Sequence, residues 1–177
     1  MKKTLFTIML AFFALNVFAG DHNSVRLISG STDVFKESAT ALLEFDYSET
    51  TWEEDEIYEL YCGSEFEERV NISVKAFEKK FNITSKGLKI KKEDSNAKYK
   101  IIVKIIDLEQ HQSMSMWGRL TMEVTAQIDV IDIATGNNVC SLKLTKIQGE
   151  ADYATNDRIS KAFCNVADRI LTGKIKK

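Results

Sequence analysis

Histidine and methionine side chains, which are common metal ligands, gather in one short run from His111 to Trp117. Thioethers select Cu(I) and imidazole also binds copper, and an extended loop brings the alternate residues Met114 and Met116 to one ion. This spacing predicts a copper site formed by His111, Met114 and Met116. The alternative, which we favour because no fourth ligand is evident, is a loop whose Met and Trp side chains pack on the end of a sheet.

The sequence offers few groups for catalysis. Besides His111 it contains only His22, and it has no GxGxxG, P-loop, HExxH or CxxC motif. Glu44 and Asp46 are suited to acid–base work only if they line a cleft about 5 to 9 Å apart. Carboxylates on the polar side of a strand are more often solvated or paired. We therefore predict no catalytic residues and no cofactor, with an enzyme that uses a carboxylate pair as the alternative.

Charge is segregated along the chain. Residues 37–68 contain twelve acidic residues and no Lys or Arg, whereas residues 69–104 contain eleven basic residues and three acidic ones. Acidic residues in first turns stabilise helices, which accounts for much of this pattern; a bipolar surface for a protein partner is the alternative. If there is a partner, we expect it beside the first strand, at Glu44, Asp46 and Glu49, or against the acidic segment that follows.

The chain of 177 residues begins with the pattern of a secretory signal peptide. Lys2 and Lys3 are followed by an apolar run at 5–18, which is short for a membrane anchor, and then by Ala19. We expect cleavage between Ala19 and Gly20 and a periplasmic or secreted protein. No cysteine lies near the cut and no later apolar stretch reaches about 18 residues, so we expect neither a lipid anchor nor a stable membrane anchor.

Composition places the rest of the chain among small folded domains. Without the two leader lysines the net charge falls from −2 to −4, which excludes a general attraction to nucleic acid. A hydrophobic content of 44% argues against disorder. We predict a flexible lead-in at 20–36, a single domain at 37–173 and a basic tail at 174–177.

Hydrophobic periodicity predicts the elements of this domain. Alternation with a period of two indicates four strands, at about 39–47, 98–105, 119–131 and 140–148. Helical spacing indicates a short helix that starts at a capping box formed by Thr51 and Glu54, a longer one at about 65–82, and a terminal one that ends at Gly173.

The resulting order is β-α-β-β-β-α, in which the short helix and the longer helix that follows it count as one helical segment. A right-handed crossover makes the first two strands parallel, and the last three form an antiparallel meander. We expect an α/β fold of the two-layer α+β kind, a four-stranded mixed sheet with both helices on one face. The residues leave open whether Cys140 and Cys164 form a disulfide and what the oligomeric state is.

Four features resemble a known group: residues 41–48 with the acidic segment around Trp52, residues 98–104, the hairpin at Thr135-Gly136, and the closing amphipathic helix. Together they cover most of residues 34–172 and resemble a family of small exported bacterial proteins of unassigned function. The order of elements is also loosely similar to the amino-terminal domain of the Tol-system propeller protein and to curli-secretion-type lipoproteins, although a lipidated cysteine is missing. The resemblance implies a periplasmic α/β interaction domain that is not an enzyme.

Overall fold

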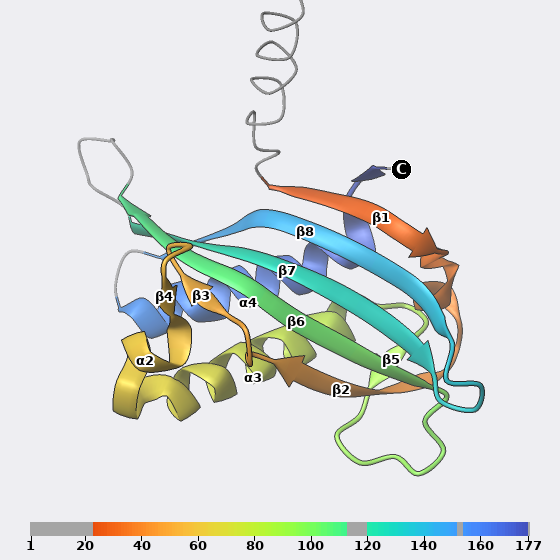
Figure 1. The fold of residues 1–177 in the computed structure, drawn as a ribbon. Coiled ribbons are helices and arrows are strands. Elements are labelled where there is room, and N and C mark those ends of the chain that lie inside the picture. The colour runs from red at the N-terminus through yellow and green to blue at the C-terminus, as the bar shows by residue number, and fades with distance from the viewer. Residues whose placement is uncertain (1–22, 113–119, 152–153, 177) are drawn as a thin grey trace, which may run out of the picture.

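A mixed β-sheet with two long helices on one of its faces makes up the described part of the chain (Figure 1). The computed structural model describes residues 23–112, 120–151 and 154–176. The predicted signal peptide and its cleavage site lie outside the described residues. Within these ranges, the helices lack the length and apolar character that crossing a membrane requires.

The four predicted strands form the centre of the sheet. They are β2 (Thr40–Asp46), β6 (Tyr99–Gln112), β7 (Leu120–Asp132) and β8 (Asn138–Glu150). As predicted, β2 runs parallel to β6, and β6, β7 and β8 form an antiparallel meander. The alternation that indicated these strands therefore also indicated which of their faces is buried.

The sheet is larger than predicted because five further strands join it. Three short strands lie around β2 and the far end of β6: β3 (Thr51–Trp52), β4 (Glu56–Ile57) and β5 (Lys89–Ile90). On the other side, β1 (Ser24–Gly30) pairs antiparallel with β8, and β9 (Ile175–Lys176) pairs parallel with β1. The strand β8 lies between β7 and β1 and is thus an interior strand.

The predicted lead-in and tail are corrected by these additions. Residues 24–30 form β1, the 3-10 helix η1 (Thr32–Lys36) follows at once, and the tail contains β9. Only Val25 is buried within β1, and the other side chains of that strand are at least partly exposed. A strand that is ordered by backbone pairing and buries one apolar residue leaves no periodic signal in its sequence.

Two long helices cover the apolar face of the sheet. They are α3 (Phe66–Thr84) and α4 (Thr155–Thr172), and the short α2 (Tyr58–Cys62) and the 3-10 helix η2 (Gly63–Glu65) precede α3. Phe45 of β2 packs against Phe77 of α3 and Phe163 of α4, with ring centroids 5.6 and 5.7 Å apart. The predicted stripe of the terminal helix is fully buried: Ile159, Phe163, Val166 and Ile170.

The capping box predicted at Thr51 and Glu54 does not form. Thr51 lies in β3, and its hydroxyl donates to the Ile106 carbonyl and to Asp107 Oδ1, at 3.3 and 2.5 Å. The Glu54 amide donates to the same Asp107 oxygen at 3.0 Å. The polar groups that were expected to cap a helix instead fasten a β-hairpin to β6, and α2 starts later, at Tyr58.

A bulge in β6 changes which side chains face the helices. The register with β7 shifts between Ile105 and Asp107, so that Ile105 and Leu108 are both fully buried. Because a bulge inserts one residue, the residues after it point to the opposite side from the one that strict alternation assigns. Asp107, Glu109 and His111 consequently lie together on the face of the sheet that the helices do not cover.

A second bulge lies in β8, across β7 from the first. The pairing with β7 shifts between Val124 and Ala126, and Lys146 has a left-handed φ of 50°. The Lys146 amide donates to Thr125 Oγ1 at 3.3 Å. The two bulges flank Thr125, so β6 and β8 change their alternation at the same level of the sheet.

All three cysteines are free thiols, so Cys140 and Cys164 form no disulfide. Cys164 Sγ contacts the carbonyl oxygen of Ala76 in α3 at 3.6 Å, whereas Cys140 is buried in the sheet. Burial raises the pKa of the Cys140 thiol to about 11. This thiol is therefore protonated at neutral pH.

The first prediction concerns the buried hydroxyl that stabilises the β6 bulge. Thr50 is buried, and its Oγ1 donates to the Ile105 carbonyl at 2.8 Å. We expect Thr50→Val to lower the free energy of unfolding by about 1–3 kcal/mol, because the carbonyl at the bulge loses this partner. Urea denaturation measures the change.

The matched variant Thr50→Ser keeps the hydroxyl and should retain most of the stability. A Thr50→Val variant as stable as the unchanged protein, with a loss only in Thr50→Ser, would mean that the methyl group, and not the hydrogen bond, matters at this position.

Candidate functional site

The acidic residues predicted to bind a partner beside β2 are engaged within the sheet. Glu44 forms an ion pair with Lys100, and Glu49 forms one with Lys104 at 2.5 Å; both lysines belong to β6. Asp46 accepts hydrogen bonds from the hydroxyl and the amide of Ser48, at 2.6 and 2.9 Å, which lower the pKa of its carboxyl. Much of the charge expected to attract a basic strand is already balanced by contacts inside the protein.

The edge of β2 is nevertheless partly open. The short strand β5 pairs only with Thr40 and Ala41, and β6 occupies the other side of β2. Among the described residues, no strand pairs with the outer edge of β2 beyond Ala41. The geometry therefore leaves room for strand addition there, but at an edge whose carboxylates are paired.

The acidic segment after β2 forms a tight hairpin between β3 and β4. Glu53 and Glu54 both have left-handed φ values, 53° and 66°, as the two central residues of a mirror-image turn do. Such positions favour Asn or Gly, so two glutamates there cost conformational energy. The hairpin is fixed to β6 by the bond from the Glu53 amide to the Leu108 carbonyl at 2.9 Å and by Asp107.

Ring stacking holds α2 against this hairpin. The rings of Trp52 and Tyr61 stack with centroids 4.1 Å apart and planes inclined by 9°. The Arg69 guanidinium lies 5.6 Å from the centre of the Tyr61 ring, and Tyr58 is buried beneath. Tyr61 is therefore a partly exposed ring in a fixed position.

Large apolar side chains are exposed on this hairpin and on α2. The exposed fractions are 56% for Ile57, 70% for Leu60 and 39% for Tyr61. The same hairpin and helix carry the exposed acidic residues Glu53, Glu54, Asp55, Glu56 and Glu59. We call these eight residues the α2 surface. Exposed large apolar side chains on one short segment that also carries exposed charges are typical of interaction sites.

A second cluster lies on the sheet face opposite the helices. His111 Nε2 is 3.0 Å from Glu109 Oε2 on its own strand and 3.5 Å from Glu123 Oε2 on β7. We call Glu109, His111 and Glu123 the carboxylate–histidine cluster. Met114 and Met116, the other residues of the predicted copper site, lie outside the described residues.

Neighbouring side chains hold the two carboxylates of this cluster. Lys146 Nζ is 2.8 Å from Glu109 Oε1 and 2.9 Å from Oε2, and Gln148 donates to Glu123 Oε1 at 2.6 Å. Burial is the largest single influence on Glu109 and opposes its ionisation, but the hydrogen bond and charge of Lys146 together with the contacts to His111 and Asp107 outweigh it and lower the pKa of this carboxyl. Both glutamates are buried, whereas the His111 side chain is 51% exposed.

Little in the sequence distinguishes Glu109 and Glu123 from other glutamates. Glu123 alternates with buried residues in β7, and this pattern places it on the polar side of that strand. Glu109 follows the bulge, where strict alternation would have placed it toward the helices. The one available signal was an unbroken alternation in β7, which assigns Glu123 to the open face, together with the proximity of Glu109 to His111.

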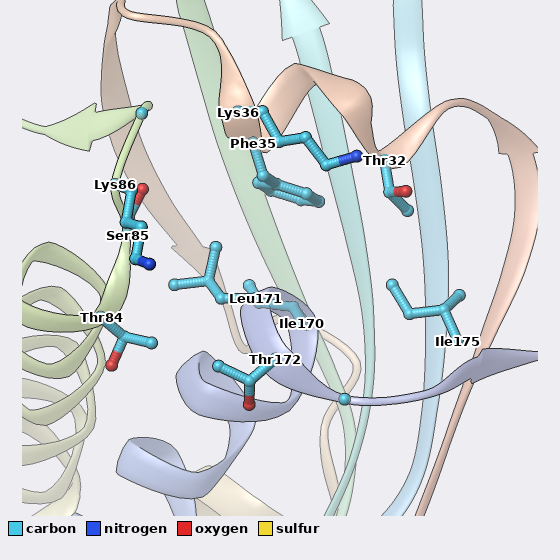
Figure 2. A pocket seen from close by; sticks show the side chains of 12 residues that line it. Thr32, Phe35, Lys36, Thr84, Ser85, Lys86, Ile170, Leu171, Thr172 and Ile175 are labelled. Atoms are coloured by element: carbon cyan, nitrogen blue, oxygen red, sulfur yellow. The ribbon is translucent and has the colours of Figure 1, made fainter.

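A pocket of about 560 Å³ lies at the opposite end of the domain (Figure 2). Figure 2 shows Phe35 of η1, Leu171 at the end of α4 and Ile175 of β9 around it, with Ser85 and Lys86 on the far side. The C-terminal ends of α3 and α4 both border the pocket and disfavour anions, while its lysines disfavour cations. Its size fits a small molecule, but its electrostatics select no ligand class.

Comparison with known proteins assigns no family. No family model matches the chain, and no curated protein matches it. Among solved structures, the PelC dodecamer from Paraburkholderia phytofirmans is similar, with 12% identity, a TM-score of 0.46, and coverage of 84% of this chain and 98% of that one.

A neuraminyllactose-binding hemagglutinin homolog from Helicobacter pylori is similar with 13% identity and a TM-score of 0.37, over 81% of this chain and 86% of that one. Likenesses at this level identify neither a family nor a function.

The second prediction concerns the ion pair that holds Glu109. Lys146→Met leaves a buried carboxylate without its ammonium partner, and we expect the free energy of unfolding to fall by about 1–3 kcal/mol. The double variant Glu109→Gln/Lys146→Met should recover part of this loss, because the side chain at position 109 then carries no charge that needs the ammonium group. Urea denaturation of the single and double variants forms the cycle, and strictly additive effects would contradict the coupling.

Proposed function

We propose that this protein is a non-catalytic interaction module that binds a basic segment of a partner protein through the α2 surface. The observation that supports the proposal most strongly is the exposure of Ile57, Leu60 and Tyr61 within a rim of carboxylates. Residues 37–68 contain no Lys or Arg, so the side chains of this part of the chain supply no opposite charge for that rim.

Apolar and acidic groups have different tasks in such a contact. Burial of Leu60 and Ile57 against a partner removes apolar surface from water, at about 25 cal/mol per Å². The acidic rim attracts and orients a basic segment and disfavours acidic competitors. Tyr61 loses little conformational freedom on binding because Trp52 already holds its ring.

The paired carboxylates of β2 favour the α2 surface over the strand edge as the main contact. Glu44 and Glu49 would have to exchange Lys100 and Lys104 for basic groups of the partner, with little net gain. We retain the open edge of β2 as a place where the partner's chain continues beyond the α2 surface.

The same contacts bear on the enzymatic alternative. An acid–base pair needs two carboxyls that face a substrate, whereas Glu44 is paired with Lys100 and Asp46 accepts from Ser48. These engagements support a non-catalytic function for the two residues.

We also propose that the protein acts in the periplasm or outside the cell. The support is the leader itself: Lys2 and Lys3, the apolar run at 5–18, and Ala19. The third prediction is that the protein recovered from the expressing cell begins at Gly20. Mass spectrometry of the intact protein and of its N-terminal peptide measures this, and a chain that begins at Met1 would exclude cleavage.

The fourth prediction tests the α2 surface with a defined probe. We expect a labelled peptide rich in Lys and Leu to bind the protein, and its counterpart with Glu in place of Lys not to bind. Leu60→Asp should weaken peptide binding at least about tenfold, because the loss of one buried leucine contact is worth about 1.5–3 kcal/mol. Fluorescence anisotropy at low and high salt measures the affinity and its electrostatic part.

Two variants serve as controls for this experiment. Ile83→Asp places the same charge at an equally exposed position of α3, 70% accessible and outside the α2 surface, and should leave binding unchanged. Reversal of Glu44, Asp46 and Glu49 to Lys tests the β2 edge. Equal losses in Leu60→Asp and Ile83→Asp would show a nonspecific charge effect, and a loss only in the triple variant would move the contact to β2.

A further inference from the structure

We propose that Glu109, His111 and Glu123 bind a divalent first-row transition metal cation, with Zn²⁺ as its representative. This proposal is independent of the α2 surface. It rests on the distances between the ligand atoms, on the burial of two facing carboxylates, and on a third carboxylate beside them.

The distances between the ligand atoms suit a small cation. Two ligands that are each about 2.1 Å from a tetrahedral Zn²⁺ lie about 3.4 Å from each other. His111 Nε2 is 3.0 and 3.5 Å from the nearer oxygens of Glu109 and Glu123. The three ligand atoms all lie within 4.8 Å of one another, so modest side-chain rotations bring them around one ion.

The two carboxylates face each other across a strand pair. Glu109 is directly opposite Glu123 in the register of β6 and β7, and both side chains are at least nine-tenths buried. Like charges at directly opposite positions destabilise a sheet. A cation that both carboxylates ligate turns this repulsion into attraction.

The carboxylate of Asp107 is a separate observation that supports a cation site at the carboxylate–histidine cluster. Asp107 is only 6% exposed, and its Oδ1 accepts from Thr51 and from the Glu54 amide. Its second oxygen, Oδ2, is buried and makes no hydrogen bond with any residue in the described ranges. Asp107 shares the open face of the sheet with Glu109, two residues further along β6. A buried carboxylate oxygen next to the cluster is available to a metal ion or to a water molecule bound to it.

Lys146 now occupies part of the coordination space. Its ammonium contacts both oxygens of Glu109. Its side chain is 24% exposed, so it can swing toward solvent when a metal ion takes its place. The His111 side chain is half exposed, so a metal ion can reach this ligand from solvent. Lys146 is therefore the internal competitor of the metal ion.

The ligand types select the metal. Carboxylate oxygens and an imidazole nitrogen suit Zn²⁺ and its first-row neighbours, whereas Cu(I) prefers sulfur ligands. A single imidazole with two carboxylates also favours Zn²⁺ over Mg²⁺, which is held mainly by oxygen and water. These ligands point to an ion different from the Cu(I) that the spacing of His111, Met114 and Met116 suggests.

The experiment is a calorimetric titration of the protein, purified without a polyhistidine tag, with Zn²⁺ and with Mg²⁺. We expect one Zn²⁺ per chain and no comparable binding of Mg²⁺. His111→Ala should weaken Zn²⁺ binding at least about tenfold, and Glu123→Gln should weaken it further. Because the His111 ring is half exposed, His111→Ala should fold normally, which circular dichroism checks.

Substitution of Lys146, the internal competitor, distinguishes a metal site from an ion-pair network that only stabilises the fold. Lys146→Met should bind Zn²⁺ more tightly than the unchanged protein, and added Zn²⁺ should restore part of its thermal stability. Lys143→Met, which removes an exposed charge from the same strand, is the matched control and should change the affinity little. Absence of Zn²⁺ binding, or an affinity that is unchanged in His111→Ala, would overturn the proposal.

Discussion

Two β-bulges, one in β6 and one in β8, lie on either side of Thr125 in β7 and reverse the face of the sheet to which the following side chains point. The α2 surface and the carboxylate–histidine cluster both depend on this reversal. The bulge in β6 lets Ile105 and Leu108 both enter the core, and it turns Asp107, Glu109 and His111 to the open face. The bulge at Lys146 in β8 has the same effect two strands away. Without these changes, strict alternation would direct the carboxyls of β6 into the apolar layer under the helices, where burial of a charge is costly.

Asp107 connects the two surfaces. Its Oδ1 accepts from Thr51 and from the amide of Glu54, and it thereby holds a hairpin turn that two left-handed glutamates would otherwise destabilise. Its other oxygen lies on the same face as the carboxylate–histidine cluster. One side chain therefore positions the acidic rim of the α2 surface and also adds a carboxylate next to Glu109.

The helices determine which face of the sheet is available for such chemistry. Phe45, Phe77 and Phe163 join β2, α3 and α4 into one apolar layer, which leaves the opposite face polar and accessible. Glu123 is almost fully buried although it lies on the side without helices.

The central architecture can be predicted from the residue pattern. Period-two alternation in β7 and the apolar stripe of α4 each identify an element and its buried face, because burial on one side of a regular structure repeats along the chain. The role of Thr51 follows from the tertiary structure alone, since the same spacing serves a helix cap and a hairpin, and the acceptor Asp107 is 56 residues away. The tertiary structure alone also added β1, which is ordered by backbone pairing with β8, and brought Glu109, His111 and Glu123 together. Bulges and cross-strand register govern that convergence, and neither leaves a periodic signal in the sequence.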